Sequence, residues 1–172
     1  MGTSRKSKAA GLLAASGPFA KQFSGFVPRE QQQTLADAIS HALRDSVPCL
    51  AEAGTGVGKT LAYLVPLLLW LAKNDGNTAV ISTHTIALQT QLVEKDIPAV
   101  LDVLGLDITF AVLKGRQNYL CHQEMDVAAA DLLAEIDPGF VKLQQWTKET
   151  KTGDVADLPF VFGNWHDVSS HP

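Results

Sequence analysis

The stretch from Glu52 to Thr60 constrains this chain more than any other. It reads Glu-Ala-Gly-Thr-Gly-Val-Gly-Lys-Thr, so every second residue from 54 to 58 is glycine. An apolar run at residues 47–51 precedes it, and an almost wholly apolar stretch at residues 61–72 follows. This order predicts a strand, a glycine-rich loop and a helix, which together are typical of a phosphate-binding loop.

The residue types in the loop suit a polyphosphate ligand. Glycine permits φ > 0 and close approach of the backbone to an anion, and the following helix N-terminus favours negative charge. Lys59 can reach the β and γ phosphates, and the Thr60 hydroxyl can bind Mg²⁺, so both are predicted to serve catalysis. The first position is alanine instead of glycine, and alanine is still small enough for a close loop. The predicted nucleotide-binding residues of the loop are Ala53, Gly54, Thr55, Gly56, Val57, Gly58, Lys59 and Thr60. The alternative is a chance glycine turn.

Composition limits the class of protein. The 172 residues are 46% hydrophobic and 19% charged, which is typical of one folded domain. The net charge of −4 argues against a protein that mainly coats nucleic acid. Cys49 and Cys121 are too few and too far apart for a disulfide framework, which favours the cytoplasm. The apolar stretch at 61–72 falls short of the roughly 20 residues of a membrane span, so we expect no membrane segment. We also expect the protein to be a monomer.

The remaining pattern predicts an α/β fold with a parallel sheet. Continuous apolar runs suit strands that are buried on both faces, and apolar residues at helical spacing suit the helices between them. The predicted strands are 47–51, 78–82 and 108–113; the predicted helices are 30–44, 61–72, 83–95 and a short one after Pro98. Residues 1–24 are predicted to be a flexible leader, residues 25–118 part of a nucleotide-binding domain, and residues 119–172 a helical insertion.

Four separated stretches carry a resemblance to a known family. Besides the loop, these are Phe26-x-x-Arg29-x-x-Gln32, the motif Ser82-Thr-His-Thr-x-Ala-Leu-Gln-x-Gln-Leu92, and Leu113-Lys-Gly-Arg-x-Asn-Tyr-Leu-Cys121. In this order and spacing they resemble the DinG-type helicases, the bacterial branch of the XPD-like iron-sulfur DNA helicases of superfamily 2. The resemblance implies a RecA-like P-loop NTPase fold and ATP-driven unwinding of DNA in the 5′ to 3′ direction.

The resemblance also implies roles for single residues. Arg29 and Gln32 correspond to the element that contacts adenine. Cys121 corresponds to the first of four thiolate ligands of a 4Fe-4S cluster. The residues implied to bind single-stranded or forked DNA are Thr83, His84, Thr85 and Gln89.

Each role has an alternative in the sequence itself. Arg29 and Gln32 also fit solvated residues at a helix start, and Thr83 and Thr85 also fit helix caps. Cys121 also fits a small buried hydrophobic residue, or a zinc ligand together with nearby histidines. Those histidines are His122, His166 and His171. Cys49 is predicted to lie in the core, and Trp146 and Trp165 to serve packing instead of base stacking.

One element of a helicase motor is absent from the sequence. No apolar strand ends in Asp-Glu-x-His, whose carboxylates hold Mg²⁺ and orient the attacking water. We therefore expect the N-terminal part of a DinG-type helicase that hydrolyses little ATP by itself. The alternatives are a small P-loop kinase and a truncated protein that binds nucleotide or DNA without catalysis.

Overall fold

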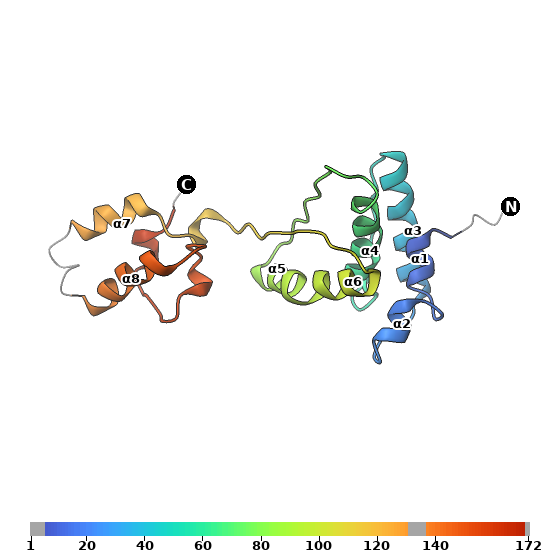
Figure 1. Ribbon diagram of the computed structural model, residues 1–172, viewed down its shortest axis with the longest axis horizontal. Coiled ribbons are helices and arrows are strands. Elements are labelled where there is room, and N and C mark those ends of the chain that lie inside the picture. Colours follow the sequence, from blue (N-terminus) through green and yellow to red (C-terminus); the bar gives the residue numbers. More distant parts are fainter. Residues whose placement is uncertain (1–5, 131–136, 171–172) are drawn as a thin grey trace. The chain divides into compact units, whose positions relative to one another are not determined.

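The computed structural model describes residues 6–130 and 137–170. The chain divides into two compact units, residues 1–112 and 113–172, each of which is described by itself. Figure 1 shows helices along both units. The first unit contains α1 (Lys8–Leu12), α2 (Pro18–Gln22), α3 (Glu30–Asp45), α4 (Lys59–Leu71), α5 (Ile86–Gln91), the π-helical segment η1 (Leu92–Asp96) and α6 (Ile97–Leu104).

Helices α3 and α4 form the centre of the first unit. The helix predicted at 30–44 is confirmed as α3, which ends where Ser46 adopts a left-handed conformation with φ 54°. The helix predicted at 61–72 is confirmed as α4, although it begins earlier, at Lys59. Pro66 lies inside α4 and removes one backbone donor there. The core that these helices share includes fully buried Ala36 and Leu64.

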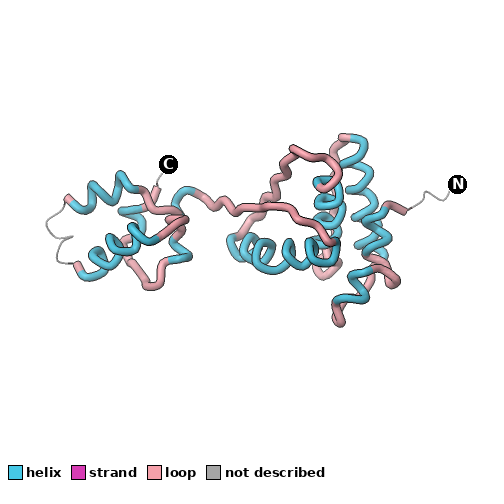
Figure 2. Tube along the Cα trace, in the orientation of Figure 1, coloured by secondary structure: helices cyan, strands magenta, loops and turns pink. Residues whose placement is uncertain are grey.

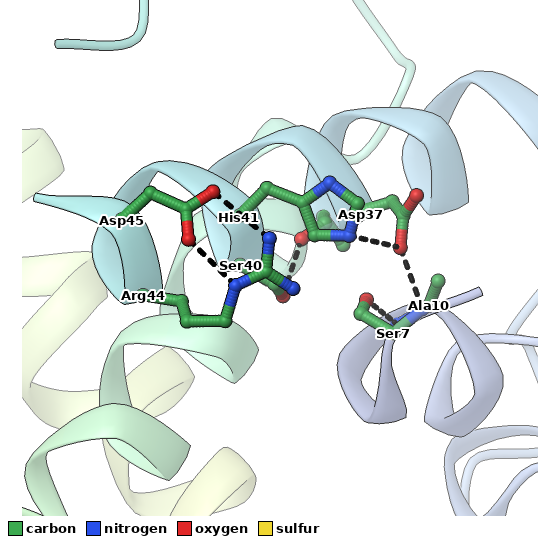
Figure 3. Close-up of polar contacts among 8 residues, drawn as sticks. Ser7, Ala10, Asp37, Ser40, His41, Arg44 and Asp45 are labelled. Atoms are coloured by element: carbon green, nitrogen blue, oxygen red, sulfur yellow. Dashed lines mark hydrogen bonds and ion pairs between the residues drawn. The ribbon is translucent and has the colours of Figure 1, made fainter. Parts of the chain in front are cut away.

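Short helices occupy part of the segment predicted to be a flexible leader. Leu13, the C-cap residue of α1, and Phe19 in α2 belong to the core, and both side chains are fully buried. At the start of α1, the Ser7 N–H donates to Asp37 Oδ1 of α3 over 2.6 Å, as Figure 3 shows. His41 Nε2 lies 4.0 Å from the same carboxylate oxygen. Polar contacts as well as apolar burial therefore hold α1 against α3.

The region predicted as two helices around Pro98 is one continuous helical run. Residues 86–104 pass from α5 through η1 into α6 without a break. The Ile97 N–H donates to the Leu92 carbonyl, which is the wider π-helical spacing, just before Pro98, which has no N–H to donate. Leu92 is buried, whereas Leu88 is 49% exposed.

The parallel sheet is not confirmed. Residues 47–51, 78–82 and 108–113 run as loops, and the part of the chain that the structure describes contains no named strand, as the tube in Figure 2 shows. Leu50 is 103% exposed and Val80 is 90% exposed, so these apolar residues have no covering layer. Cys49 is also exposed, and the prediction that it lies in the core is wrong. A strand requires a neighbouring strand, and these segments do not pair with one another.

The second unit has its own small core. It contains η2 (Arg116–Asn118), α7 (His122–Ala129), α8 (Pro138–Glu149), η4 (Val155–Asp157) and η5 (Trp165–Val168). Trp146 is buried and its ring meets that of Trp165 at 6.3 Å, so the prediction that these residues serve packing is confirmed. Residues 131–136 and 171–172 of the predicted helical insertion lie outside the described residues, and His171 is among them.

Backbone bridges close the second unit. Tyr119 pairs with Asp154 and Leu120 with Ser169 as isolated antiparallel bridges. Beside them, Lys114 Nζ lies 2.5 Å from Asp154 Oδ2, with both side chains about nine-tenths buried. Among the described residues of the whole chain, no helix is long and apolar enough to cross a membrane.

Candidate nucleotide-binding site

The glycine-rich loop has the backbone that its sequence predicts at two of its three glycines. Gly56 has φ 78° and Gly58 has φ 84°, both in the left-handed region, whereas Gly54 does not. Gly58 is the N-cap of α4, so the loop leads directly into a helix N-terminus. Among the described residues, no group accepts a hydrogen bond from the backbone N–H groups of residues 54–58. These donors are therefore available to an anion.

Lys59 folds back over the loop that precedes it. Its Nζ donates to the Ala53 carbonyl over 2.8 Å and to the Gly54 carbonyl over 3.1 Å. The side chain belongs to an exposed residue, so the ammonium also has access to water. To reach a phosphate, Lys59 must exchange these carbonyl oxygens for phosphate oxygens, which are stronger acceptors because they are charged.

The two residues that the resemblance assigns to adenine lie in different environments. Arg29 is the exposed N-cap residue of α3. Gln32 is only 1% exposed, and its Nε2 donates to the Gly58 carbonyl over 3.0 Å. Its other polar atom, Oε1, is buried and has no hydrogen-bond partner among the described residues. The structure thus places Gln32 against the phosphate loop and leaves Arg29 in solvent.

A hollow of about 400 Å³ lies beside the loop. Lys59, Thr60 and Ala53 line it together with Thr83, so the structure brings the phosphate loop near one residue of the predicted DNA-binding segment. Its lining also includes Cys49, which the sequence predicted to lie in the core, and two side chains without a role in the sequence analysis, Tyr63 and Asp96. Tyr63 follows Lys59 by four residues, which places both on the same face of a helix. This spacing is the only sequence feature that could have indicated Tyr63 as part of the site.

Tyr63 interacts with the predicted magnesium ligand. Burial raises the pKa of the Tyr63 hydroxyl above its ordinary value of 10.0, a hydrogen bond with Thr60 opposes the rise, and the charge of Asp96 adds to it. Tyr63 is therefore protonated at neutral pH.

The predicted DNA-binding residues surround the start of α5. The Thr85 hydroxyl accepts from the Leu88 N–H over 3.3 Å, which is the N-cap contact considered as an alternative. The Thr83 hydroxyl donates to the Thr85 carbonyl over 3.2 Å. His84 is exposed, and Gln89 is half-buried. Thr85 thus serves as a helix cap, and this cap fixes the position of the exposed segment before α5.

Cys121 lies in the second unit, as the N-cap residue of α7. It is half-buried, and its backbone N–H donates to the Val168 carbonyl over 2.8 Å. No group of three or more His, Cys, Asp or Glu residues that could hold a metal ion occurs in the described ranges. The described residues therefore do not fit a 4Fe-4S cluster, and Cys121, His122 and His166 do not gather as a zinc site; His171 lies outside the described residues.

Comparisons with known proteins agree with the geometry of the loop. The model of the DEAD/DEAH box helicase family matches residues 29–152. The chain is 40% identical over 147 residues to the ATP-dependent DNA helicase YoaA of Escherichia coli, with 84% of this chain and 22% of that protein covered. It is 39% identical over 167 residues to the ATP-dependent helicase DinG of Mycobacterium tuberculosis, with 84% and 25% covered.

A third relative is named for a different activity. The 3′-5′ exonuclease DinG of Bacillus subtilis is 35% identical over 136 residues, with 78% of this chain and 14% of that protein covered. The chain therefore spans a quarter or less of the length of these curated relatives.

Proposed function

Since this chain belongs to the DEAD/DEAH box helicase family, we propose that it forms the nucleotide-binding part of an ATP-dependent DNA helicase of the DinG type. The observation that carries the proposal is the loop before α4. Its Gly56 and Gly58 have positive φ, and the N–H groups of residues 54–58 have no acceptor among the described residues. Such a loop at a helix N-terminus suits the phosphates of ATP.

The roles of the loop residues in binding follow from their contacts. On binding, Lys59 exchanges the carbonyls of Ala53 and Gly54 for the β and γ phosphates. The Thr60 hydroxyl, at the start of α4, would bind Mg²⁺. The metal neutralises charge on the phosphates when it is bound. Arg29 is exposed at the start of α3 and is the residue we assign to the base.

For the DNA strand we propose the segment before α5. This segment carries hydroxyl, imidazole and amide groups near a helix start, from Thr83, His84, Thr85 and Gln89. Such groups can contact DNA phosphates without reading the base sequence. The net charge of −4 makes such binding weak and sensitive to salt. For the whole protein, we propose that the substrate is single-stranded or forked DNA. We also propose that the protein acts in the cytoplasm as a monomer.

Hydrolysis and unwinding require residues beyond this chain. The sequence contains no Asp-Glu pair to hold Mg²⁺ and orient water, so we propose that the chain alone binds ATP with little turnover. The exposed apolar side chains of Leu50 and Val80 support a parallel sheet that forms when further strands pair with residues 47–51 and 78–82. A 4Fe-4S cluster forms no part of the proposal, because the described residues do not fit it.

Equilibrium binding of Mg-ATP to the purified chain tests this function. We expect saturable binding that Lys59→Ala weakens at least tenfold, because a charge-assisted contact to phosphate contributes roughly 1.5 kcal/mol or more. Lys73→Ala is the matched control, since Lys73 is exposed at the end of α4, away from the loop. Equal affinity in wild type and Lys59→Ala would contradict the proposal. Phosphoryl transfer to a small acceptor would instead favour the kinase alternative.

Binding to labelled single-stranded DNA tests the second part of the function. We expect weak binding that falls as salt rises, with a further loss of similar size for every base sequence in His84→Ala. His166→Ala, in the second unit, is a control of the same residue type. An affinity that salt does not change, or a loss confined to one base sequence, would argue against contacts to the phosphate backbone.

A further inference from the structure

The N-terminal segment, residues 6–23, is bound to α3 through the amide of Gln33. Lys6 Nζ donates to Gln33 Oε1 over 3.2 Å, and Gln33 Nε2 donates to the Leu13 carbonyl over 3.4 Å. The two contacts assign the orientation of the amide, because an ammonium group only donates and a carbonyl only accepts. They add to the contact of Ser7 with Asp37 that Figure 3 shows. Gln33 thus holds the chain both before and after α1.

Gln33 also closes the first turn of α3. Its backbone N–H donates to the carbonyl of Arg29, the N-cap residue, over 3.2 Å. The Arg29 side chain makes no capping hydrogen bond, so this helix start lacks the side-chain cap that usually stabilises such a turn. The contacts of Gln33 with the N-terminal segment therefore fix a turn that would otherwise fray.

An aromatic contact holds the chain on the other side of Arg29. Phe26 lies three residues before Arg29, and its ring centroid is 6.1 Å from that of Phe19 in α2. Phe19 is fully buried, and Phe26 packs against the same core. The N-terminal segment thus binds the chain before Arg29 through Phe26 and after it through Gln33, although the Arg29 side chain itself is exposed.

We propose that the N-terminal segment positions Arg29 for the nucleotide base, with Gln33 as the positioning residue. The proposal rests on the nucleotide binding proposed above, in which Arg29 is assigned to the base. Gln32, in the same turn, is held by its own burial and by its bond to the Gly58 carbonyl, whereas Arg29 depends on the stability of the turn. The phosphates bind elsewhere, at the loop before α4. Gln33 therefore sets the affinity for the base and leaves the affinity for the phosphates unchanged.

The test separates the base from the phosphates. Gln33→Met keeps the length of the side chain and removes both of its contacts with the N-terminal segment. Gln31→Met is the matched control, because Gln31 is exposed in the same turn. Affinities of the whole chain for Mg-ATP and for inorganic tripolyphosphate with Mg²⁺ are measured by calorimetry, also with each change added to Arg29→Ala. Hydrogen exchange of peptides that cover residues 8–13 and 27–34 is measured without ligand.

We expect Gln33→Met to weaken Mg-ATP binding roughly threefold or more, as for loss of one hydrogen bond, with unchanged affinity for tripolyphosphate. In the Arg29→Ala background the same change should weaken ATP binding no further, because Gln33 acts through Arg29. Equal losses for both ligands would overturn the inference, since a general loss of structure gives that result. Unchanged ATP affinity, or a full additional loss in Arg29→Ala, would overturn it as well.

Failure of the proposed function gives a different result. If wild type binds neither ligand, nucleotide binding by this chain is refuted, whatever Gln33 does. If wild type binds both ligands equally, phosphate binding stands and recognition of the base by this chain is refuted. The exchange measurement tests the link itself, since it uses no ligand: both peptides should exchange faster in Gln33→Met than in Gln31→Met. Wild-type exchange rates in Gln33→Met would refute the positioning role.

Discussion

Phe19 provides the sharpest test of the packing in the first unit. The sequence predicts a flexible leader up to residue 24, whereas the structure buries Phe19 completely. Its ring centroid lies 6.1 Å from those of Phe23 and Phe26. If residues 1–24 were a flexible leader, Phe19→Ala would not change the stability of the chain. If Phe19 packs in the core, the same substitution lowers the stability.

The magnitude follows from the buried area. A phenylalanine side chain buries about 200 Å², and at about 25 cal/mol per Å² this gives an upper limit of about 5 kcal/mol. A compact unfolded state and the remaining Cβ lower the cost for Phe19→Ala to about 3–4 kcal/mol, within the range of measured Phe→Ala changes. With a urea m-value of about 1–3 kcal/mol per M, the midpoint falls by about 1 M or more.

The assay is urea unfolding of the whole chain, followed by circular dichroism at the helical signal. Phe23→Ala is the comparison variant, because Phe23 is 36% exposed, and we expect a smaller loss of about 2 kcal/mol. If Phe19→Ala proves too unstable to fold, Phe19→Leu provides a milder change whose midpoint is still expected to lie below that of wild type. A midpoint within 0.2 M of wild type for Phe19→Ala would show that the segment does not pack on the core.

Three further changes probe other parts of the chain. Gly17→Ala places a Cβ 2.0 Å from the Leu12 carbonyl oxygen, so we expect a loss of about 1–3 kcal/mol in thermal unfolding; an unchanged midpoint would refute this packing. Lys114→Met leaves Asp154 as a buried unpaired charge and costs about 3–5 kcal/mol, of which added Asp154→Asn restores a part; additive losses would argue against the ion pair. Burial raises the pKa of Asp37, but the hydrogen bonds from the start of α1 and nearby positive charge outweigh this and lower it below 3.8. The contribution of Asp37 to stability is therefore present above about pH 4 and is lost as pH falls through the lowered pKa. In Asp37→Asn, the free energy of unfolding should therefore fall less steeply below pH 4 than in wild type. The same fall with pH in both proteins would contradict the contact.

Local patterns in the sequence predict the elements whose signals are contained in a few consecutive residues. The glycines and Lys59 predict a phosphate-binding loop, and helical spacing predicts α3 and α4, because loop chemistry and helix periodicity depend on near neighbours. Trp146 is predicted correctly as a packing residue for the same reason, since α8 is amphipathic. The DEAD/DEAH box helicase match agrees with the family that these motifs indicate.

Only the tertiary structure decides which of these residues are buried and what they contact. Residues 47–51 have the apolar pattern of a buried strand, yet Leu50 is exposed, because a strand is stable only with a partner and none lies beside it in the described residues. Gln32 looks like a solvated helix-start residue, yet it is buried under Gly58 by the packing of α3 on α4. The sequence by itself thus determined the chemistry of the loop and the helices around it. Burial and pairing were decided by contacts between residues far apart in the chain, which local patterns do not contain.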